Sequence, residues 1–184
     1  MSDIIGCLEQ DPVIAAVGND KWQKALESPA KVIFYMSADL LTIEERVKQA
    51  HNAGKYVMVH MDMADGIGRD RTGLRFLKNC GVDGVISTKG QLIRGAKDMG
   101  MFTVQRFFAV DSAGVDGLGE MFRNTMPDLM EIMPGVVTKV IARFASAGIP
   151  LIAGGLIQTK NEVTDALGAG ATAVSTGQPE LWYI

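Results

Sequence analysis

The sequence predicts an α/β fold, a compact (β/α)8 barrel of the TIM type that spans residues 1–184 as a single domain. Short apolar runs alternate with helical patterns along the whole chain, and this alternation is typical of α/β proteins with a parallel sheet. Eight such units can be counted, which favours a closed barrel. No proline-rich or charged linker divides the chain.

An open, doubly wound sheet of the flavodoxin or Rossmann type is the alternative architecture. The chain has 184 residues, fewer than the roughly 200 or more that are usual for such a barrel. The sequence Gly66-Ile67-Gly68 is a poor match to a dinucleotide-binding fingerprint, because the third glycine of that motif is missing.

The strand candidates are short apolar runs, as expected where helices cover both faces of a parallel sheet. The seventh is expected to end at Gly154 and the eighth near Ser175. In chain order the candidates cover residues 13–17, 32–36, 56–60, 84–89, 102–108, 129–133, 151–154 and 173–175.

The helical patterns lie between these runs and are bounded by capping signals. Thr42 with Glu45 three residues later predicts a capping box, and Asp70 is expected to cap the following helix. The predicted helices lie at residues 2–10 and 21–27, between 42 and 54, between 70 and 81, between 89 and 100, at 112–124 and 137–147, and between 155 and 173, with a stub at 179–184.

The stretch from Pro150 to Gly177 contains two strand-to-helix turns made of small residues. Bare backbone N–H groups at such turns suit a phosphate, and barrels often bind phosphate after strands seven and eight. Alternatively, the glycines serve only the tight turns. The predicted phosphate-binding residues are Gly154, Gly155, Ser175, Thr176 and Gly177.

Charged side chains stand near the C-terminal ends of strand candidates three to six, where barrel proteins place their functional groups. The predicted polar ligand residues are His60, Asp62, Lys89, Arg106 and Glu131. A spacing of two predicts that His60 and Asp62 share one face of their strand. The basic groups could pair with a phosphate, and the carboxylates could accept hydroxyl protons of a polyol. Alternatively, the charges neutralise one another in a polar barrel core.

Composition excludes several classes of protein. Two cysteines are too few for a disulfide framework, which favours a cytoplasmic location. No signal peptide and no apolar stretch of membrane-spanning length are present, so we expect no membrane contact. A tetrahedral metal site has no visible ligands, and we expect neither a metal nor another cofactor. The oligomeric state is open.

Basic residues are concentrated in one segment, although the whole chain has a net charge of −3. Residues 69–97 hold seven basic and two acidic residues, a balance of +5 in 29 residues. Neighbouring helices would merge these residues into one basic stripe suited to RNA. Ordinary solvated helix faces are the alternative, and no aromatic RNA-recognition motif of the RNP type is present. The predicted RNA-binding residues are Arg71, Arg75, Lys78, Arg94 and Lys97.

Four segments of the chain resemble the glycerol-3-phosphate-responsive antiterminator family, and together they cover nearly all of it. They are VHMDMADGIGRD at 59–70, GVISTKGQLIRGAKDMGMFTVQRFF at 84–108, EIMPGVVTKVI at 131–141 and IAGGLIQTKNEVTDALGAGATAVSTG at 152–177. The resemblance implies a TIM-type barrel, glycerol 3-phosphate as the effector, and leader mRNA of glycerol uptake genes as the second partner. It implies a regulator of transcription antitermination without a catalytic residue.

Two other functions stay open from the residues alone. The chain could be a small phosphate-binding enzyme acting on a polyol or triose phosphate, with Asp62 and Glu131 as acid and base or Lys89 as a Schiff-base amine. It could also sense a phosphorylated metabolite and act through a protein partner.

Overall fold

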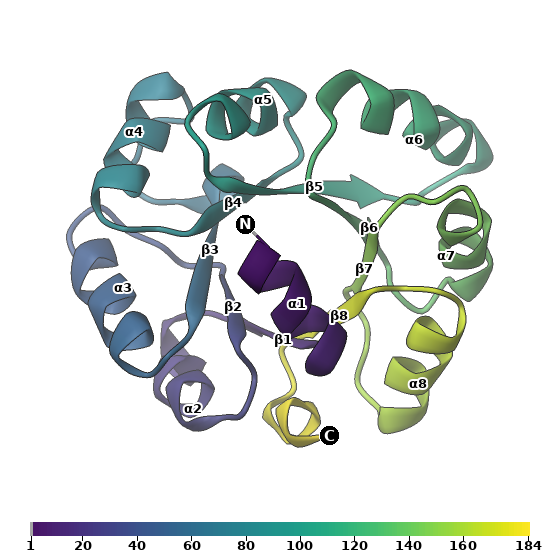
Figure 1. Ribbon diagram of the computed structural model, residues 1–184, viewed down its shortest axis with the longest axis horizontal. Coiled ribbons are helices and arrows are strands. Elements are labelled where there is room, and N and C mark those ends of the chain that lie inside the picture. Colours follow the sequence, from purple (N-terminus) through teal and green to yellow (C-terminus); the bar gives the residue numbers. More distant parts are fainter. Residues whose placement is uncertain (1) are drawn as a thin grey trace.

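The computed structural model describes residues 2–184 and contains one closed barrel of eight parallel strands, β1 to β8, in sequence order. Figure 1 shows the ring of strands surrounded by helices. The strands are β1 Val13–Val17, β2 Val32–Tyr35, β3 Tyr56–His60, β4 Gly84–Ser87, β5 Phe102–Phe108, β6 Leu129–Met133, β7 Leu151–Gly154 and β8 Ala173–Thr176. The predicted barrel is therefore confirmed, and the open doubly wound sheet is wrong.

Eight α-helices and three short 3-10 turns accompany the strands in the described part of the chain. The α-helices are α1 Ser2–Gln10, α2 Trp22–Glu27, α3 Ile43–Asn52, α4 Arg71–Asn79, α5 Gly90–Asp98, α6 Ser112–Thr125, α7 Thr138–Ala145 and α8 Lys160–Gly168. The 3-10 turns are η1 Asn19–Lys21, η2 Met61–Met63 and η3 Pro179–Tyr183. The predicted stub of a last helix is thus a 3-10 turn.

Helix capping agrees with the sequence at one predicted cap and differs at the other. The carboxylate of Asp70 accepts hydrogen bonds from two N–H groups in the first turn of α4, as predicted. Thr42 makes no such bond, so the predicted capping box is wrong. Asp39 instead accepts the N–H groups of Leu41 and Thr42 and also the Thr42 hydroxyl, because its side chain lies just before the helix.

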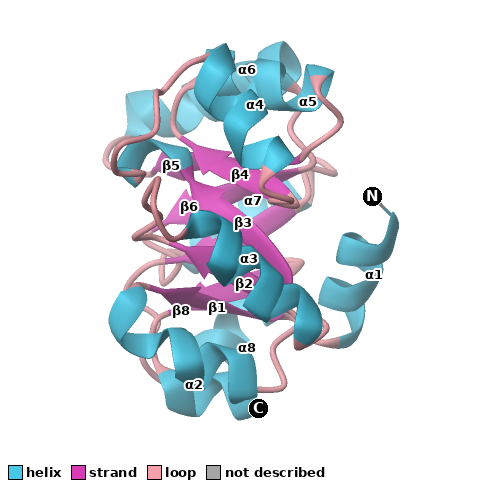
Figure 2. Ribbon diagram, turned by 90° about the vertical axis from the view of Figure 1, so that its left-hand side faces the viewer, coloured by secondary structure: helices cyan, strands magenta, loops and turns pink. Residues whose placement is uncertain are grey.

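The inside of the barrel is apolar at one end and polar at the other. Phe34, Met58, Val104 and Ile152 belong to an inner cluster of buried side chains that α1 joins through Ile4 and Leu8. Figure 2 shows α1 beyond one end of the strands, which is the end where they begin. Helix α1 therefore closes the N-terminal end of the barrel and leaves the C-terminal end as the place for a ligand.

A second and larger apolar cluster lies between the strands and the surrounding helices. Burial of both faces explains why the strand sequences are continuous apolar runs. No helix within residues 2–184 is long and apolar enough to cross a membrane.

Candidate functional site

The C-terminal end of the barrel holds a layer of inward-facing polar side chains. Strand residues two apart share a face, so Arg106, which follows Val104 at that spacing, faces the interior. The same spacing turns Glu131 inward after Leu129, and Ser175 after Ala173. These three side chains come from β5, β6 and β8 and form the polar floor of the barrel mouth.

Arg106 and Glu131 form a buried ion pair across neighbouring strands. They are partners in the β5–β6 register, and the Nε of Arg106 lies 2.6 Å from Oε2 of Glu131. The other carboxylate oxygen, Oε1, accepts the hydroxyl of Ser175 at 2.7 Å. The two charged side chains are 7% and 0% exposed. The predicted mutual neutralisation of charges therefore holds for this pair, and both oxygens of Glu131 are already engaged.

A cavity of about 140 Å³ opens over this floor. This volume is well below the range of roughly 300–1,000 Å³ that drug-sized ligands occupy, so the cavity suits a small metabolite. Its lining comprises Ala16, Met36, Arg106, Glu131, Met133, Gly155, Leu156, Ile157, Ser175, Thr176 and Gly177.

Larger hollows of about 440 and 450 Å³ lie on the outside of the barrel, along α6 and α7. The charged side chains that line them, such as Arg143 and Asp116, are exposed. Preorganised, buried polar groups are typical of ligand sites, so the smaller cavity at the barrel mouth is the better candidate.

The predicted phosphate turns form one wall of the mouth cavity. Gly155 has a φ of +74°, and a Cβ atom there would lie 2.6 Å from Cε of Met133. Gly154 is confined for another reason, since a Cβ atom would meet the side chains of Glu131 and Ser175. At Gly177 a Cβ atom would only touch the carbonyl oxygen of Ala16, at 3.4 Å. The first turn therefore requires glycine much more strictly than the second.

Backbone donors at both turns are free to bind a ligand. Within the described residues, no acceptor takes the N–H of Gly155 or of Gly177. The hydroxyl of Thr176 is used internally, because it donates to the carbonyl oxygen of Ile157 at 2.8 Å. The two turns are thus fixed to each other, and Gly155 and Gly177, whose N–H groups are unused, both line the same cavity.

Lys21 is a residue of this region that sequence reasoning did not identify. Its ammonium group donates to the carbonyl oxygen of Gly177 across 2.7 Å and is partly buried. The two residues are 156 positions apart in the chain. Since only the closure of β1 against β8 brings them together, no local pattern in the sequence could have revealed the contact.

His60 lies in the same polar layer, at the end of β3, and is 4% exposed. Burial and the nearby positive charge of Arg106 lower the pKa of His60. The carboxylates of Asp62 and Glu131 raise it less strongly. The imidazole is therefore held in its neutral form near pH 7.

Asp62 does not share a strand face with His60, so that prediction is wrong. Strand β3 ends at His60, and Asp62 lies in the 3-10 turn η2. Its Oδ1 accepts the Ser87 hydroxyl at 2.7 Å, and its Oδ2 accepts the N–H and hydroxyl of Thr88. Burial raises the pKa of Asp62, but these hydrogen bonds together lower it. Asp62 thus fastens the turn after β4 and does not line the cavity.

Lys89 is also placed differently from the prediction. Strand β4 ends at Ser87, and Lys89 is the exposed residue that precedes α5. Its side chain does not line the mouth cavity. Of the five predicted polar residues, the structure therefore brings Arg106 and Glu131 onto the cavity wall, with His60 in the same layer.

The predicted basic surface on α4 and α5 is only partly free. The ammonium groups of Lys78 and Lys97 donate to the carbonyl oxygens of Met99 and Met126, at the ends of the neighbouring helices. These two lysines are therefore partly neutralised by helix C-termini.

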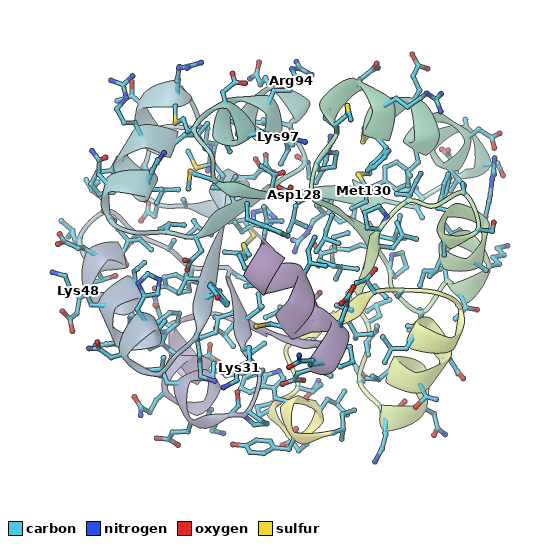
Figure 3. The ribbon with its side chains drawn as sticks, viewed as in Figure 1. Lys31, Lys48, Arg94, Lys97, Asp128 and Met130 are labelled. Carbon is cyan, nitrogen blue, oxygen red and sulfur yellow. The ribbon has the colours of Figure 1, made fainter. Side chains whose placement is uncertain are left out.

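The three arginines of this surface are all exposed. Arg71 makes a long contact of 3.8 Å with Asp98. Arg75 and Arg94 form no ion pair with any described residue. Figure 3 marks Arg94 on the outer side of α5. No group of three or more potential metal-ligating side chains occurs among the described residues.

Comparisons with known proteins agree with these features. The family model for the glycerol-3-phosphate responsive antiterminator matches residues 13–182. The uncharacterized protein YgcP of Escherichia coli (strain K12) is 36% identical, over 98% of this chain and 96% of its own length.

Two solved structures of related proteins are similar along nearly their whole length. The glycerol uptake operon antiterminator regulatory protein from Listeria monocytogenes is 32% identical with a TM-score of 0.86, covering 92% of this chain and 94% of that one. The glycerol uptake operon antiterminator-related protein from Thermotoga maritima is 32% identical with a TM-score of 0.84, covering 94% and 98%. The chain therefore belongs to the glycerol-3-phosphate responsive antiterminator family.

Proposed function

We propose that this protein is a cytoplasmic regulator that binds glycerol 3-phosphate in the mouth of the barrel and leader mRNA on its outer surface, and so controls transcription antitermination. The observation that supports it most directly is the mouth cavity. Unused N–H groups of two glycine turns and the buried Arg106–Glu131 pair line one space of about 140 Å³.

The phosphate binds at the two turns in this proposal. The N–H groups of Gly155 and Gly177 donate to its oxygens, as bare backbone amides do in other anion sites. The charge of Arg106 is already balanced by Glu131, so a phosphate dianion needs further positive charge. Lys21 supplies it, because its ammonium group lies against the carbonyl oxygen of Gly177.

The polyol part of the ligand lies over the floor of the mouth. Ser175 and Glu131 both line the cavity, and an ionised carboxylate offers about four lone-pair sites. Glu131 can therefore accept a ligand hydroxyl in addition to its present bonds. This arrangement selects a short hydroxylated phosphate over an apolar one.

RNA binds, in this proposal, to a surface formed by Arg71, Arg75 and Arg94 on α4 and α5. Guanidinium groups suit phosphate oxygens, and these three side chains are exposed. The turn that Asp62 fastens leads directly into α5. A ligand that changes this turn would therefore change the position of Arg94.

An enzyme is the second candidate, because Glu131 is a buried carboxylate at a barrel mouth. Two features favour the regulator. Glu131 is the one carboxylate among the residues that line the cavity, and Asp62, its expected acid–base partner, does not line it. Lys89, the amine considered for a Schiff base, is exposed and away from the cavity.

The decisive experiment is a pair of titrations. Affinity for the leader transcript is measured with and without saturating glycerol 3-phosphate, and affinity for glycerol 3-phosphate with and without saturating RNA. Coupling must be reciprocal, so both pairs should differ by the same factor. If RNA binds but neither affinity changes, the small molecule does not control RNA binding.

Two further outcomes separate the other functions. Binding of glycerol 3-phosphate without any binding of RNA would favour a sensor that acts through a protein partner. Turnover of a polyol or triose phosphate, abolished by Glu131→Gln, would favour the enzyme.

A further inference from the structure

The Nδ1 of His60 is the one buried side-chain nitrogen or oxygen that lacks a hydrogen-bond partner among the described residues. A buried polar atom without a partner loses the hydrogen bonds that it made to water, so such atoms are rare in native proteins and call for an explanation. His60 is otherwise well packed at 4% exposure. A missing partner at a ligand site is the simplest explanation.

The position of His60 in the polar layer places it beside the mouth cavity. The β2–β3 register pairs Tyr35 with Val59, so the next residue along each strand brings Met36 beside His60. Met36 lines the cavity, and so does Arg106 from β5. His60 therefore occupies the part of the layer between Met36 and Arg106.

Two side chains that line the cavity, Met36 and Arg106, meet in a weak contact. The Nη2 of Arg106 lies 4.0 Å from the sulfur of Met36, and a thioether is a poor acceptor. The guanidinium and the imidazole are thus two neighbouring groups that are incompletely satisfied in the same layer. Methionine adapts its side chain at low cost, so an oxygen-bearing ligand can displace this contact.

We propose that His60 determines the specificity of the ligand site, and that its Nδ1 forms a hydrogen bond with a hydroxyl of the bound polyol phosphate when that ligand displaces the Met36–Arg106 contact. A hydroxyl both donates and accepts, so it satisfies either tautomer of a neutral imidazole. This inference rests on the proposed function. It adds His60 as the side chain that distinguishes a hydroxylated phosphate ester from inorganic phosphate.

The test combines ligand analogues with protein variants, and calorimetry measures the affinity of each combination. The probes are glycerol 3-phosphate, its two analogues that each lack one hydroxyl (3-hydroxypropyl phosphate and 2-hydroxypropyl phosphate), and inorganic phosphate. The wild-type protein should prefer glycerol 3-phosphate over one of the analogues by about fivefold, since a hydrogen bond of this kind contributes on the order of 1 kcal/mol.

The protein variants are His60→Phe, His60→Asn and the control His51→Phe. His60→Phe should lose the preference but still bind inorganic phosphate. His60→Asn, whose amide can lie where Nδ1 lies, should recover part of it. His51 is the other histidine of the chain and pairs with Asp83 on the surface, so its variant should behave like the wild type.

Nuclear magnetic resonance gives a second measurement that needs no variant of His60. The chain has two histidines, so the imidazole spectrum is simple to assign with His51→Phe. Glycerol 3-phosphate should shift the His60 signals, and inorganic phosphate should shift them much less. This spectrum keeps the idea testable if His60→Phe does not fold.

The outcomes separate this inference from the proposed function. If the wild-type protein binds neither glycerol 3-phosphate nor phosphate, the proposed function fails. If glycerol 3-phosphate binds but His60→Phe keeps the full preference, or the His60 signals stay unchanged at saturation, the role of His60 is overturned and the ligand site stands.

Discussion

The indole Nε1 of Trp182 donates a hydrogen bond to the carbonyl oxygen of Thr176 across 2.9 Å. Trp182 is fully buried, although it lies only two residues from the C-terminus. Because Thr176 and Gly177 form the turn after β8, this bond fastens the C-terminal 3-10 turn η3 to a wall of the mouth cavity. The tryptophan is therefore a natural reporter of the ligand site.

Ligand binding is expected to change the fluorescence of Trp182. An anion at the Gly177 N–H alters the peptide unit that Thr176 and Gly177 share, and this unit carries the carbonyl that Trp182 contacts. Titration with glycerol 3-phosphate should give a saturable change in emission. Trp22, the other tryptophan, packs against Tyr35 at a ring distance of 4.7 Å. Trp22→Phe should keep the change and Trp182→Phe should lose it.

Substitution of Gly155 should abolish ligand binding more than it affects stability. Gly155→Ala puts a Cβ atom against Met133 in the cavity wall and strains a backbone with a φ of +74°. The strain costs about 1 kcal/mol. We expect at least a tenfold loss of affinity for glycerol 3-phosphate in calorimetry, and no measurable binding for Gly155→Leu.

Gly100→Ala is the matched control for this substitution. Gly100 has a φ of +73°, and a Cβ atom there would point into open space, with no neighbour within 4 Å. The variant should lose similar stability to chemical denaturation while keeping full affinity. Equal affinity losses in the two variants would mean that backbone strain, and not the site, explains the result at Gly155.

Removal of the Arg106 charge should destabilise the fold strongly. Arg106→Met leaves Glu131 as a buried carboxylate without its cation, which costs about 3–5 kcal/mol. Adding Glu131→Gln should recover most of this loss, because no isolated charge remains and the amide oxygen can still accept the Ser175 hydroxyl. Urea unfolding of the wild type, the single variant and the double variant gives the free energy of unfolding of each.

Arg143→Met provides the comparison for a surface pair. Arg143 lies 2.8 Å from Asp116, but the two side chains are 54% and 66% exposed. Exposed ion pairs contribute little to the free energy of unfolding, so this variant should unfold at nearly the same urea concentration as the wild type. If Arg106→Met and Arg143→Met lost similar amounts of unfolding free energy, burial of the Arg106–Glu131 pair would not explain its contribution to stability.

Stability should fall as the pH falls below about 6.5, and His60 should account for part of the fall. Burial and the charge of Arg106 lower the pKa of His60 in the folded protein below its ordinary value of 6.5. Between these two values the unfolded chain binds a proton that the folded chain does not, so stability rises with pH there. Urea unfolding from pH 7.5 to 5 should show a weaker pH dependence in His60→Phe than in the wild type.

The fold was predictable because its signals are local. Each strand is a short apolar run, and Asp70 caps its helix from its own position in the chain. The meeting of Arg106 and Glu131 was also predictable, since both stand near the ends of neighbouring strands and side chains two apart share a face.

Other features depend on where a strand stops or on contacts between distant residues. Strand β3 ends at His60, so Asp62 leaves the strand face. The sequence predicts Lys78 and Lys97 on a basic stripe, but each donates to a carbonyl oxygen at the C-terminal end of the next helix. Such contacts depend on the spacing of helices around the barrel, which no sequence period encodes.

The outer surface of α4 and α5 should bind RNA through its arginines. Reversing Arg71 and Arg75 to Glu places negative charge where phosphates would lie, so affinity for the leader transcript should fall across different sequences. In a plot of the logarithm of affinity against the logarithm of salt concentration, the slope should become less steep. The change in slope should be roughly 0.7 to 0.9 for each lost phosphate contact. Glycerol 3-phosphate binding should stay nearly unchanged, because neither residue lines the mouth cavity.

Two controls define what the arginine result means. Lys48→Glu makes the same kind of charge reversal on α3, and Figure 3 shows Lys48 well away from Arg94. It should leave RNA binding intact if the effect is local and not a matter of net charge. Lys78→Met and Lys97→Met remove lysines already bonded to carbonyl oxygens, so each should weaken binding less than the arginine reversals. Equal losses from Lys48→Glu would show that RNA responds only to the overall charge of the protein, and the surface on α4 and α5 would have to be given up as the RNA site.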